Sequence, residues 1–109
     1  MRFCFTFRPR FSSAVKAAFL DRDGVINVDY AYVHSRENFH FIPGALEGAA
    51  ELVRKGHQLI IVTNQSGIGR GKYSIDQFRE LTFWLAGVFA RNHAPLSAVY
   101  FCPHHPTHA

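Results

Sequence analysis

The stretch Val15-Lys16-Ala17-Ala18-Phe19-Leu20-Asp21-Arg22-Asp23-Gly24 indicates the fold of this chain. Its mostly apolar first part ends abruptly in two aspartates, which predicts a buried β-strand that runs into a polar loop. The pattern returns downstream, where an apolar strand predicted over residues 58–62 is followed by Thr63-Asn64-Gln65-Ser66-Gly67. A third short strand is predicted over residues 98–101.

Two amphipathic helices are predicted between these strands. The first follows Pro43-Gly44 and ends at Lys55-Gly56, and it has apolar residues at helical spacing: Leu46, Ala49, Ala50 and Val53. A capping box of Ser74 and Gln77 starts the second, whose apolar stripe comprises Phe78, Leu81, Leu85, Val88 and Phe89. Residues 25–42 lack periodicity and are interpreted as a structured loop or flap. This order predicts an α/β fold, a partial doubly wound, Rossmann-like parallel sheet with three strands present.

Positive charge is concentrated at the N-terminus. Of the 12 Lys and Arg residues, four precede Asp21, and the remaining eight balance the eight Asp and Glu residues. Residues 1–14 are therefore interpreted as a basic arm that we expect to be disordered, although its composition is also loosely typical of a transit peptide. Residues 15–109 are expected to form one domain. Because that part carries no excess of positive charge, no nucleic-acid partner is expected.

Neither the apolar runs nor the cysteines indicate a membrane or an oxidising compartment. No uninterrupted apolar run approaches the roughly 20 residues that a transmembrane helix needs, so no membrane partner is expected. The two cysteines, Cys4 and Cys102, are too few for a disulfide framework. A cytoplasmic location is predicted.

The aspartate pair suggests a chemistry. In open parallel sheets, ligands bind beyond the carboxyl ends of the strands, which is where Asp21 and Asp23 fall. Two residues apart in extended chain, their side chains point the same way, and Mg²⁺ would relieve the repulsion between the carboxylates. Mg²⁺ commonly binds together with phosphate, and a carboxylate can attack phosphorus to form an aspartyl-phosphate. A turn or a calcium loop is the alternative, but Val25, Ile26 and Val28 lack the oxygen ligands that a calcium loop requires.

Two motifs resemble those of a known superfamily. The run Phe19-Leu20-Asp21-Arg22-Asp23-Gly24-Val25-Ile26 resembles the first motif of the haloacid dehalogenase superfamily, and residues 61–67 resemble its second. Within it the chain is similar to the D-glycero-D-manno-heptose 1,7-bisphosphate 7-phosphatases of heptose biosynthesis. Supporting stretches are Asn27-Val28-Asp29, Tyr32-Val33-His34, Asn38-Phe39, Gly69-Arg70-Gly71-Lys72 and Cys102-Pro103-His104-His105-Pro106. The resemblance covers about residues 17–106 and implies that 15–109 is the N-terminal part of such a phosphatase domain.

The resemblance implies a role for each matching residue. Asp21 would be the nucleophile, and Asp23 the acid and base that protonates the leaving sugar oxygen and then deprotonates water. The Asp21 carboxylate and the Asp23 main-chain carbonyl would hold Mg²⁺. The substrate, a small sugar phosphate, would be bound by Asp29, Tyr30, Ala31, Tyr32, Thr63, Asn64, Gln65 and Ser66, with Thr63 and Asn64 on the transferring phosphoryl group.

The resemblance also implies a zinc half-site. Cys102 and His104 would be two of the four ligands of a structural Zn²⁺. His105 and His108 could replace the other pair only in a crowded arrangement.

The chain departs from the family pattern at three places. Val25 stands where threonine is usual, and Tyr30-Ala31 replaces the commoner His-Gly. The basic residue of the third motif, a distal magnesium aspartate and the second zinc pair would lie beyond residue 109. We therefore expect a C-terminally truncated chain that folds poorly alone because its first strand becomes an unpaired edge, and a monomer when complete.

Other functions fit less well or remain open. Histidinol-phosphate phosphatase shares the aspartates and the Cys-Pro-His stretch, and it is the alternative enzyme. A non-catalytic truncated product is the alternative that is not an enzyme. A response-regulator receiver domain also has acids at strand ends, but its phosphorylated aspartate follows a later strand, where this chain has none.

Overall fold

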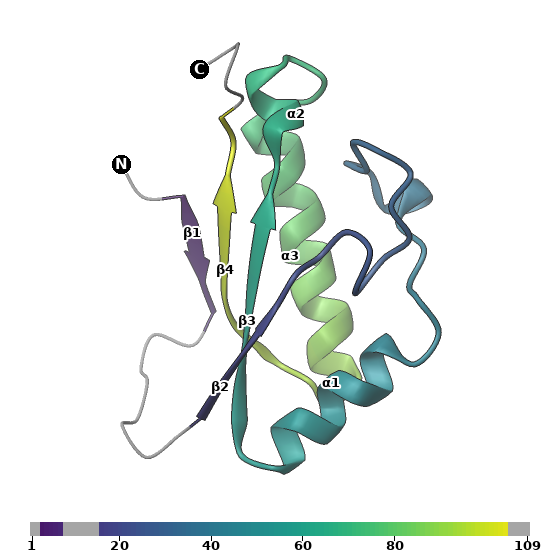
Figure 1. The fold of residues 1–109 in the computed structure, drawn as a ribbon, viewed down its shortest axis with the longest axis vertical. Helices are drawn as coiled ribbons and strands as arrows, with labels where there is room; N and C mark the ends of the chain where they lie inside the picture. The colour runs from purple at the N-terminus through teal and green to yellow at the C-terminus, as the bar shows by residue number, and fades with distance from the viewer. Residues whose placement is uncertain (1–2, 8–15, 105–109) are drawn as a thin grey trace.

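The structure is a computed structural model of the 109-residue chain, and it describes residues 3–7 and 16–104. The described residues form one four-stranded sheet of β1 (Cys4–Thr6), β2 (Lys16–Leu20), β3 (His57–Asn64) and β4 (Leu96–Cys102). The spatial order is β1-β4-β3-β2 (Figure 1). β2, β3 and β4 are parallel, so the predicted parallel α/β sheet is confirmed.

The fourth strand, β1, was not predicted, and the expected disorder of the arm is wrong for residues 4–6. β1 pairs antiparallel with β4, with Phe5 opposite Val99. Phe3, Phe5 and Phe7 alternate along this segment and pack against the core, and the Phe5 ring stacks on that of Phe101 with centroids 5.4 Å apart. Alternating aromatic residues favour a half-buried strand, and this burial outweighs the basic composition of the arm. The rest of the arm, and Val15, lie outside the described residues.

The two predicted helices are present as α1 (Ala45–Arg54) and α3 (Ile75–Arg91). Ser74 caps α3 as expected: its hydroxyl accepts the N–H of Gln77, and its own N–H donates to the Gln77 side chain. Gly56 follows the C-cap of α1 with φ of 91°, a left-handed conformation that glycine adopts without strain. A single turn, α2 (Ser66–Gly69), and a 3₁₀ turn, η1 (Arg36–Asn38), complete the described helices.

Both long helices pack on the same face of the sheet. The parallel strands follow one another in order across it, so crossovers of one hand place α1 and α3 on one side. The core there contains Leu59, Ile61, Val99, Phe78 and Phe89. No helix in the described part of the chain has the length and apolarity to span a membrane.

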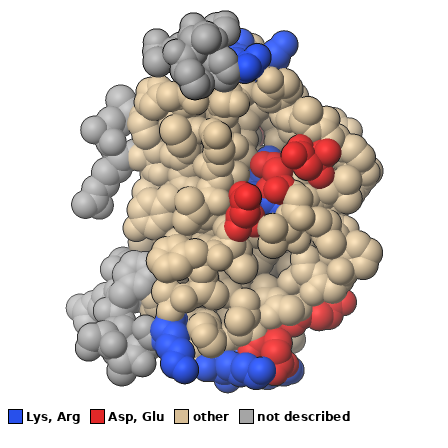
Figure 2. Space-filling view, viewed as in Figure 1, with Lys and Arg blue, Asp and Glu red and all other residues tan. Residues whose placement is uncertain are grey.

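The opposite face of the sheet is open among the described residues. Phe19, Val62 and Tyr100 are 67 %, 47 % and 44 % exposed, and Figure 2 shows that the surface over the strands is largely uncharged. Within residues 3–7 and 16–104, β2 pairs only with β3 and forms one edge of the sheet, as the sequence predicts for its first strand.

Candidate functional site

The site lies where the carboxyl ends of β2 and β3 meet the flap that follows β2. A pocket of about 400 Å³ opens there. Its lining comprises Asp21, Arg22, Asp23, Asp29, Ala31, Tyr32, Val33, Asn64, Gln65, Ser66, Gly67 and Tyr73. The structure therefore brings both predicted catalytic aspartates together with most of the predicted substrate residues, from three separate segments.

A tight turn after β2 presents Asp21 and Asp23. The carbonyl of Arg22 accepts the N–H groups of Val25 and Ile26 at 3.2 and 2.8 Å, and Gly24 has φ of 91°. Asp21 is exposed, and one of its carboxylate oxygens accepts the Arg22 N–H at 2.8 Å. Because Asp21 is exposed and lines the pocket, its carboxylate is accessible to a ligand.

The Asp23 carboxylate is held by three donors. Its Oδ1 accepts from Arg22 Nη2 at 2.8 Å and from Asn27 Nδ2 at 2.9 Å. Its Oδ2 accepts from Gln65 Nε2 at 3.2 Å. With both oxygens engaged, the plane of this carboxylate is fixed relative to both β-strand ends.

Arg22, which the sequence reasoning did not single out, is a central residue of the site. Its side chain is 3 % exposed, and its guanidinium lies 5.6 Å from the Phe39 ring centroid and 5.9 Å from that of Phe78. Nη2 also donates to the carbonyl of Val33 at 2.9 Å, so one group ties Asp23 to the flap. Its burial could not be predicted, because an arginine between two acids is usually solvated.

The segment after β3 is more enclosed than the sequence suggested. Thr63 and Gln65 are each 3 % exposed, whereas Asn64 is exposed. Gln65 Nε2 donates to the Thr63 hydroxyl at 2.9 Å, and the Tyr73 hydroxyl donates to Gln65 Oε1. Thr63 does not line the pocket, although its hydroxyl hydrogen remains free to donate.

Tyr73 is a further residue that the sequence reasoning missed. It lies just before α3, is 6 % exposed, and lines the pocket. Burial raises the pKa of its hydroxyl from 10.0 to about 12, which the nearby Arg22 partly counters. The hydroxyl therefore stays protonated, and able to donate, at neutral pH.

The flap forms the facing wall with a strained backbone. Ala31 and Tyr32 have φ of 65° and 56°, in the left-handed region where glycine is favoured. Asp29 supports this turn, because its Oδ1 accepts the Ala31 N–H at 3.0 Å. Ala31 is thus a real departure from the glycine that is usual in the resembling family. Tyr30 lies outside the pocket lining; it is 55 % exposed, and its hydroxyl is 3.0 Å from Nδ1 of His40.

The zinc half-site remains a prediction. Cys102 is a free, exposed thiol at the end of β4, and His104 is exposed with its ring 5.4 Å from that of Phe3. Across residues 3–7 and 16–104, no three His, Cys, Asp or Glu side chains are grouped to hold a metal ion. His105 and His108 lie outside the described residues.

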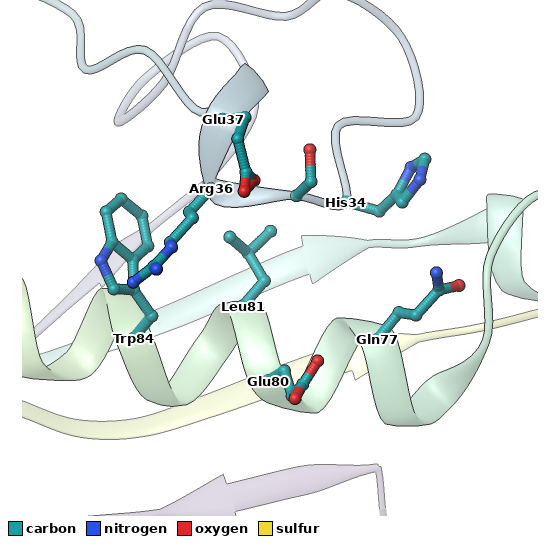
Figure 3. A pocket seen from close by; sticks show the side chains of 8 residues that line it. His34, Arg36, Glu37, Gln77, Glu80, Leu81 and Trp84 are labelled. Atoms are coloured by element: carbon teal, nitrogen blue, oxygen red, sulfur yellow. The ribbon is translucent and has the colours of Figure 1, made fainter.

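A larger hollow, of about 530 Å³, lies between the flap and α3. Figure 3 shows His34, Arg36 and Glu37 of the flap facing Gln77, Glu80, Leu81 and Trp84 of α3. It contains neither aspartate of the pair and mixes both charges on exposed side chains. The smaller pocket has the convergent polar groups, so chemistry rather than volume identifies the candidate site.

Comparison with known proteins supports this assignment. No family model matches the chain. A D-glycero-β-D-manno-heptose-1,7-bisphosphate 7-phosphatase of Vibrio cholerae is 53 % identical over 95 residues, covering 87 % of this chain and 51 % of that protein. The enzyme of the same name from Haemophilus influenzae is 51 % identical over 90 residues, covering 83 % and 49 %. The chain thus spans about half the length of the curated relatives it matches.

Solved structures agree with the sequence relatives. D,D-heptose 1,7-bisphosphate phosphatase from B. bronchiseptica, complexed with magnesium and phosphate, has a TM-score of 0.79 and 32 % identity, covering 84 % of this chain and 52 % of that one. A putative HAD-like phosphatase from Mesorhizobium loti has a TM-score of 0.86 and 30 % identity, covering 97 % and 51 %.

Fold, site and relatives together indicate one class of protein: the chain is similar to the haloacid dehalogenase-like phosphatases. Its sequence is similar to particular enzymes of this class, the heptose 1,7-bisphosphate 7-phosphatases, with 50–53 % identity.

Proposed function

We propose that this chain supplies the nucleophile and the acid/base group of a phosphatase that removes the 7-phosphate of D-glycero-D-manno-heptose 1,7-bisphosphate. The observation that carries the proposal is the placement of Asp21 and Asp23 in one pocket at the carboxyl end of β2, facing the segment after β3. The names of the sequence relatives supply the substrate. Since the chain spans about half of their length, the activity of a whole enzyme is part of the proposal.

The reaction would proceed in two displacements at phosphorus. A carboxylate oxygen of Asp21 attacks the phosphorus, and the bond from phosphorus to the sugar oxygen breaks. Asp23 donates a proton to that leaving oxygen, which departs as the sugar hydroxyl. Asp23 then takes a proton from water, the water oxygen attacks the phosphorus, and inorganic phosphate leaves with Asp21 regenerated.

The surrounding residues would hold the phosphoryl group and the sugar. The exposed amide of Asn64 is the candidate donor toward the phosphoryl oxygens, because the transition state gains from positioned donors. For Thr63, which is buried and outside the pocket lining, this role rests on the resemblance alone. Asp29, Ala31 and Tyr32 of the flap line the side of the pocket on which the sugar would lie.

The donor set at the turn suits Mg²⁺. Asp21 offers an exposed carboxylate, and Mg²⁺ needs only one or two carboxylates when substrate phosphate and water complete its shell. Because the side chain of Asp23 already accepts three hydrogen bonds, its main-chain carbonyl is the better candidate ligand. The ion would neutralise negative charge on the phosphate as the nucleophile approaches. Crystals of the B. bronchiseptica relative with magnesium and phosphate support this choice.

A phosphate-release assay tests the proposal. The chain is assayed alone and joined to the half of the V. cholerae enzyme that it does not match, with Mg²⁺ and either heptose 1,7-bisphosphate or histidinol phosphate. Release from the heptose substrate that stops on chelation of Mg²⁺ is expected. Preference for histidinol phosphate would assign the alternative enzyme, and activity that persists in excess chelator would remove the metal from the proposal.

A further inference from the structure

A chain of hydrogen bonds leads from Tyr73 through Gln65 to Asp23. The Tyr73 hydroxyl donates to Gln65 Oε1, and Gln65 Nε2 donates to Asp23 Oδ2 at 3.2 Å and to the Thr63 hydroxyl at 2.9 Å. The three residues come from the start of α3, the segment after β3 and the turn after β2. These hydrogen bonds therefore join three segments of the fold at the acid/base group.

The donor and the acceptor of each of these hydrogen bonds follow from the chemistry of the groups. A carboxylate only accepts, so the amide nitrogen of Gln65 must face Asp23, and its carbonyl oxygen must face Tyr73. Both amide hydrogens are then used, one on Asp23 and one on Thr63. Gln65 is 3 % exposed and has no free hydrogen with which to contact a substrate.

Packing holds Tyr73 in the position that these hydrogen bonds require. Its ring stacks on that of His34, with centroids 5.0 Å apart and planes at 9°. The ring also lies close to Gly67, where an added Cβ would collide with it. A protonated hydroxyl is maintained by burial, which raises the pKa of Tyr73 to about 12.

We propose that Gln65 and Tyr73 are positioning residues, which act through the hydrogen bond to Asp23 Oδ2 and not through contact with substrate. Arg22 and Asn27 hold Oδ1 alone, so without Gln65 the carboxylate can rotate about that oxygen. The role rests on the proposed function, because a fixed carboxylate matters when it must deliver a proton to a leaving oxygen. It replaces the substrate-binding role that the resemblance implied for Gln65.

Two substrates distinguish a positioning role from a general disruption of the site. A sugar phosphate needs a proton on its leaving oxygen, whereas p-nitrophenyl phosphate releases a stable anion without one. Tyr73→Phe and Gln65→Met should lower the single-turnover rate of the first displacement with the sugar phosphate by about tenfold or more and leave its half-saturating concentration unchanged. They should change the rate of the initial p-nitrophenolate burst by less than about twofold, and the burst is compared because the later hydrolysis step needs Asp23 with either substrate. Tyr100→Phe, which removes a hydroxyl from β4 outside the pocket, should match the wild-type chain. Equal losses in the rate of the first displacement with both substrates would overturn the proposal.

A second readout does not depend on turnover. The ¹³C resonance of the Asp23 carboxyl carbon, assigned by its loss in Asp23→Asn, should move in Tyr73→Phe and Gln65→Met and stay in place in Tyr100→Phe. If the wild-type chain, both alone and joined to the V. cholerae half, releases no phosphate from either substrate, the proposed function fails while this resonance still reports the positioning. A resonance that both variants leave unmoved would overturn the inference.

Discussion

The guanidinium of Arg22 lies 2.8 Å from a carboxylate oxygen of Asp23, its neighbour in the chain, and is buried between the rings of Phe39 and Phe78. The same nitrogen donates to the carbonyl of Val33 in the flap. The pair thus belongs to the site rather than to the solvated surface. Two of the three nitrogens of the guanidinium, Nε and Nη1, have no hydrogen-bond partner among the described residues. Burying these unpaired nitrogens between two aromatic rings costs free energy of folding.

Arg22→Met separates stability from function. Methionine fills the space between the two rings and removes the unpaired nitrogens, but it leaves Asp23 and the Val33 carbonyl without this donor, so the free energy of unfolding should fall by about 1–3 kcal/mol. Phosphate release should fall by at least about tenfold, because Asp23 loses its link to the flap. Urea unfolding and the release assay measure the two effects.

Arg79→Met is the matched control. Arg79 is 56 % exposed, and its nearest carboxylate oxygen, on Asp76, is 3.9 Å away. This change should leave both stability and release close to those of the unaltered chain, since exposed pairs contribute little. An Arg22→Met chain with full activity would show that the Arg22–Asp23 contact has no part in the reaction.

Two glycine-to-alanine changes should have opposite effects on the free energy of unfolding. At Gly67 an added Cβ would meet the Tyr73 ring and lie 2.8 Å from Cδ1 of Tyr32, so Gly67→Ala should destabilise the fold by about 1–3 kcal/mol. At Gly48, in α1, no atom lies within 4 Å of such a Cβ, and Gly48→Ala should stabilise the helix by about 0.5–1 kcal/mol. Thermal unfolding of both variants checks the pair, and a neutral Gly67→Ala would mean that the Tyr73 ring is free to move.

Stability should fall at alkaline pH through Tyr73. Burial raises the pKa of its hydroxyl from 10.0 to about 12, so between these values the unfolded chain loses a proton that the folded chain keeps. The stabilisation is complete below about pH 10 and is lost as the pH rises toward about 12. In Tyr73→Phe this part of the alkaline loss should disappear, as urea midpoints measured across the range would show. An unchanged pH profile would contradict the burial of the hydroxyl.

The open edge of the sheet should make the isolated chain self-associate. β2 pairs on one side only among the described residues, and Phe19 is 67 % exposed on it. A lysine on an edge strand discourages pairing with another chain, so Phe19→Lys should lower the association seen by sedimentation equilibrium. Ile75→Lys, at the 42 % exposed first residue of α3, adds the same charge away from the edge and should have no such effect. Equal association of the unaltered chain, Phe19→Lys and Ile75→Lys would show that self-association does not use the β2 edge.

The sequence predicted the parallel framework because local patterns determine it. The Ser74 capping box and the apolar run of β3 are each readable within a few residues, and both were found. β1 was not predicted because the basic composition of residues 1–14 indicates disorder, although the alternation of Phe3, Phe5 and Phe7 is typical of a half-buried strand.

The contacts inside the site could not be read in this way. Whether Gln65 faces substrate or Asp23 depends on how the segment after β3 meets the turn after β2, which lie 42 residues apart in the chain. The burial of Arg22 depends likewise on Phe39 and Phe78, from the flap and α3. Motif spacing identified the pair of aspartates, and tertiary packing decided what holds them.

The central claim, that Asp21 is the nucleophile, is tested most directly by trapping the covalent intermediate. The Asp23→Asn chain is incubated with Mg²⁺ and p-nitrophenyl phosphate, whose leaving group needs no proton, so that the first displacement proceeds and hydrolysis is slowed. After an acid quench, peptide mass spectrometry should find a phosphoryl group on Asp21, and none once Asp21→Asn is added. A phosphoryl group on another residue, or phosphate release that persists in Asp21→Asn, would contradict the account.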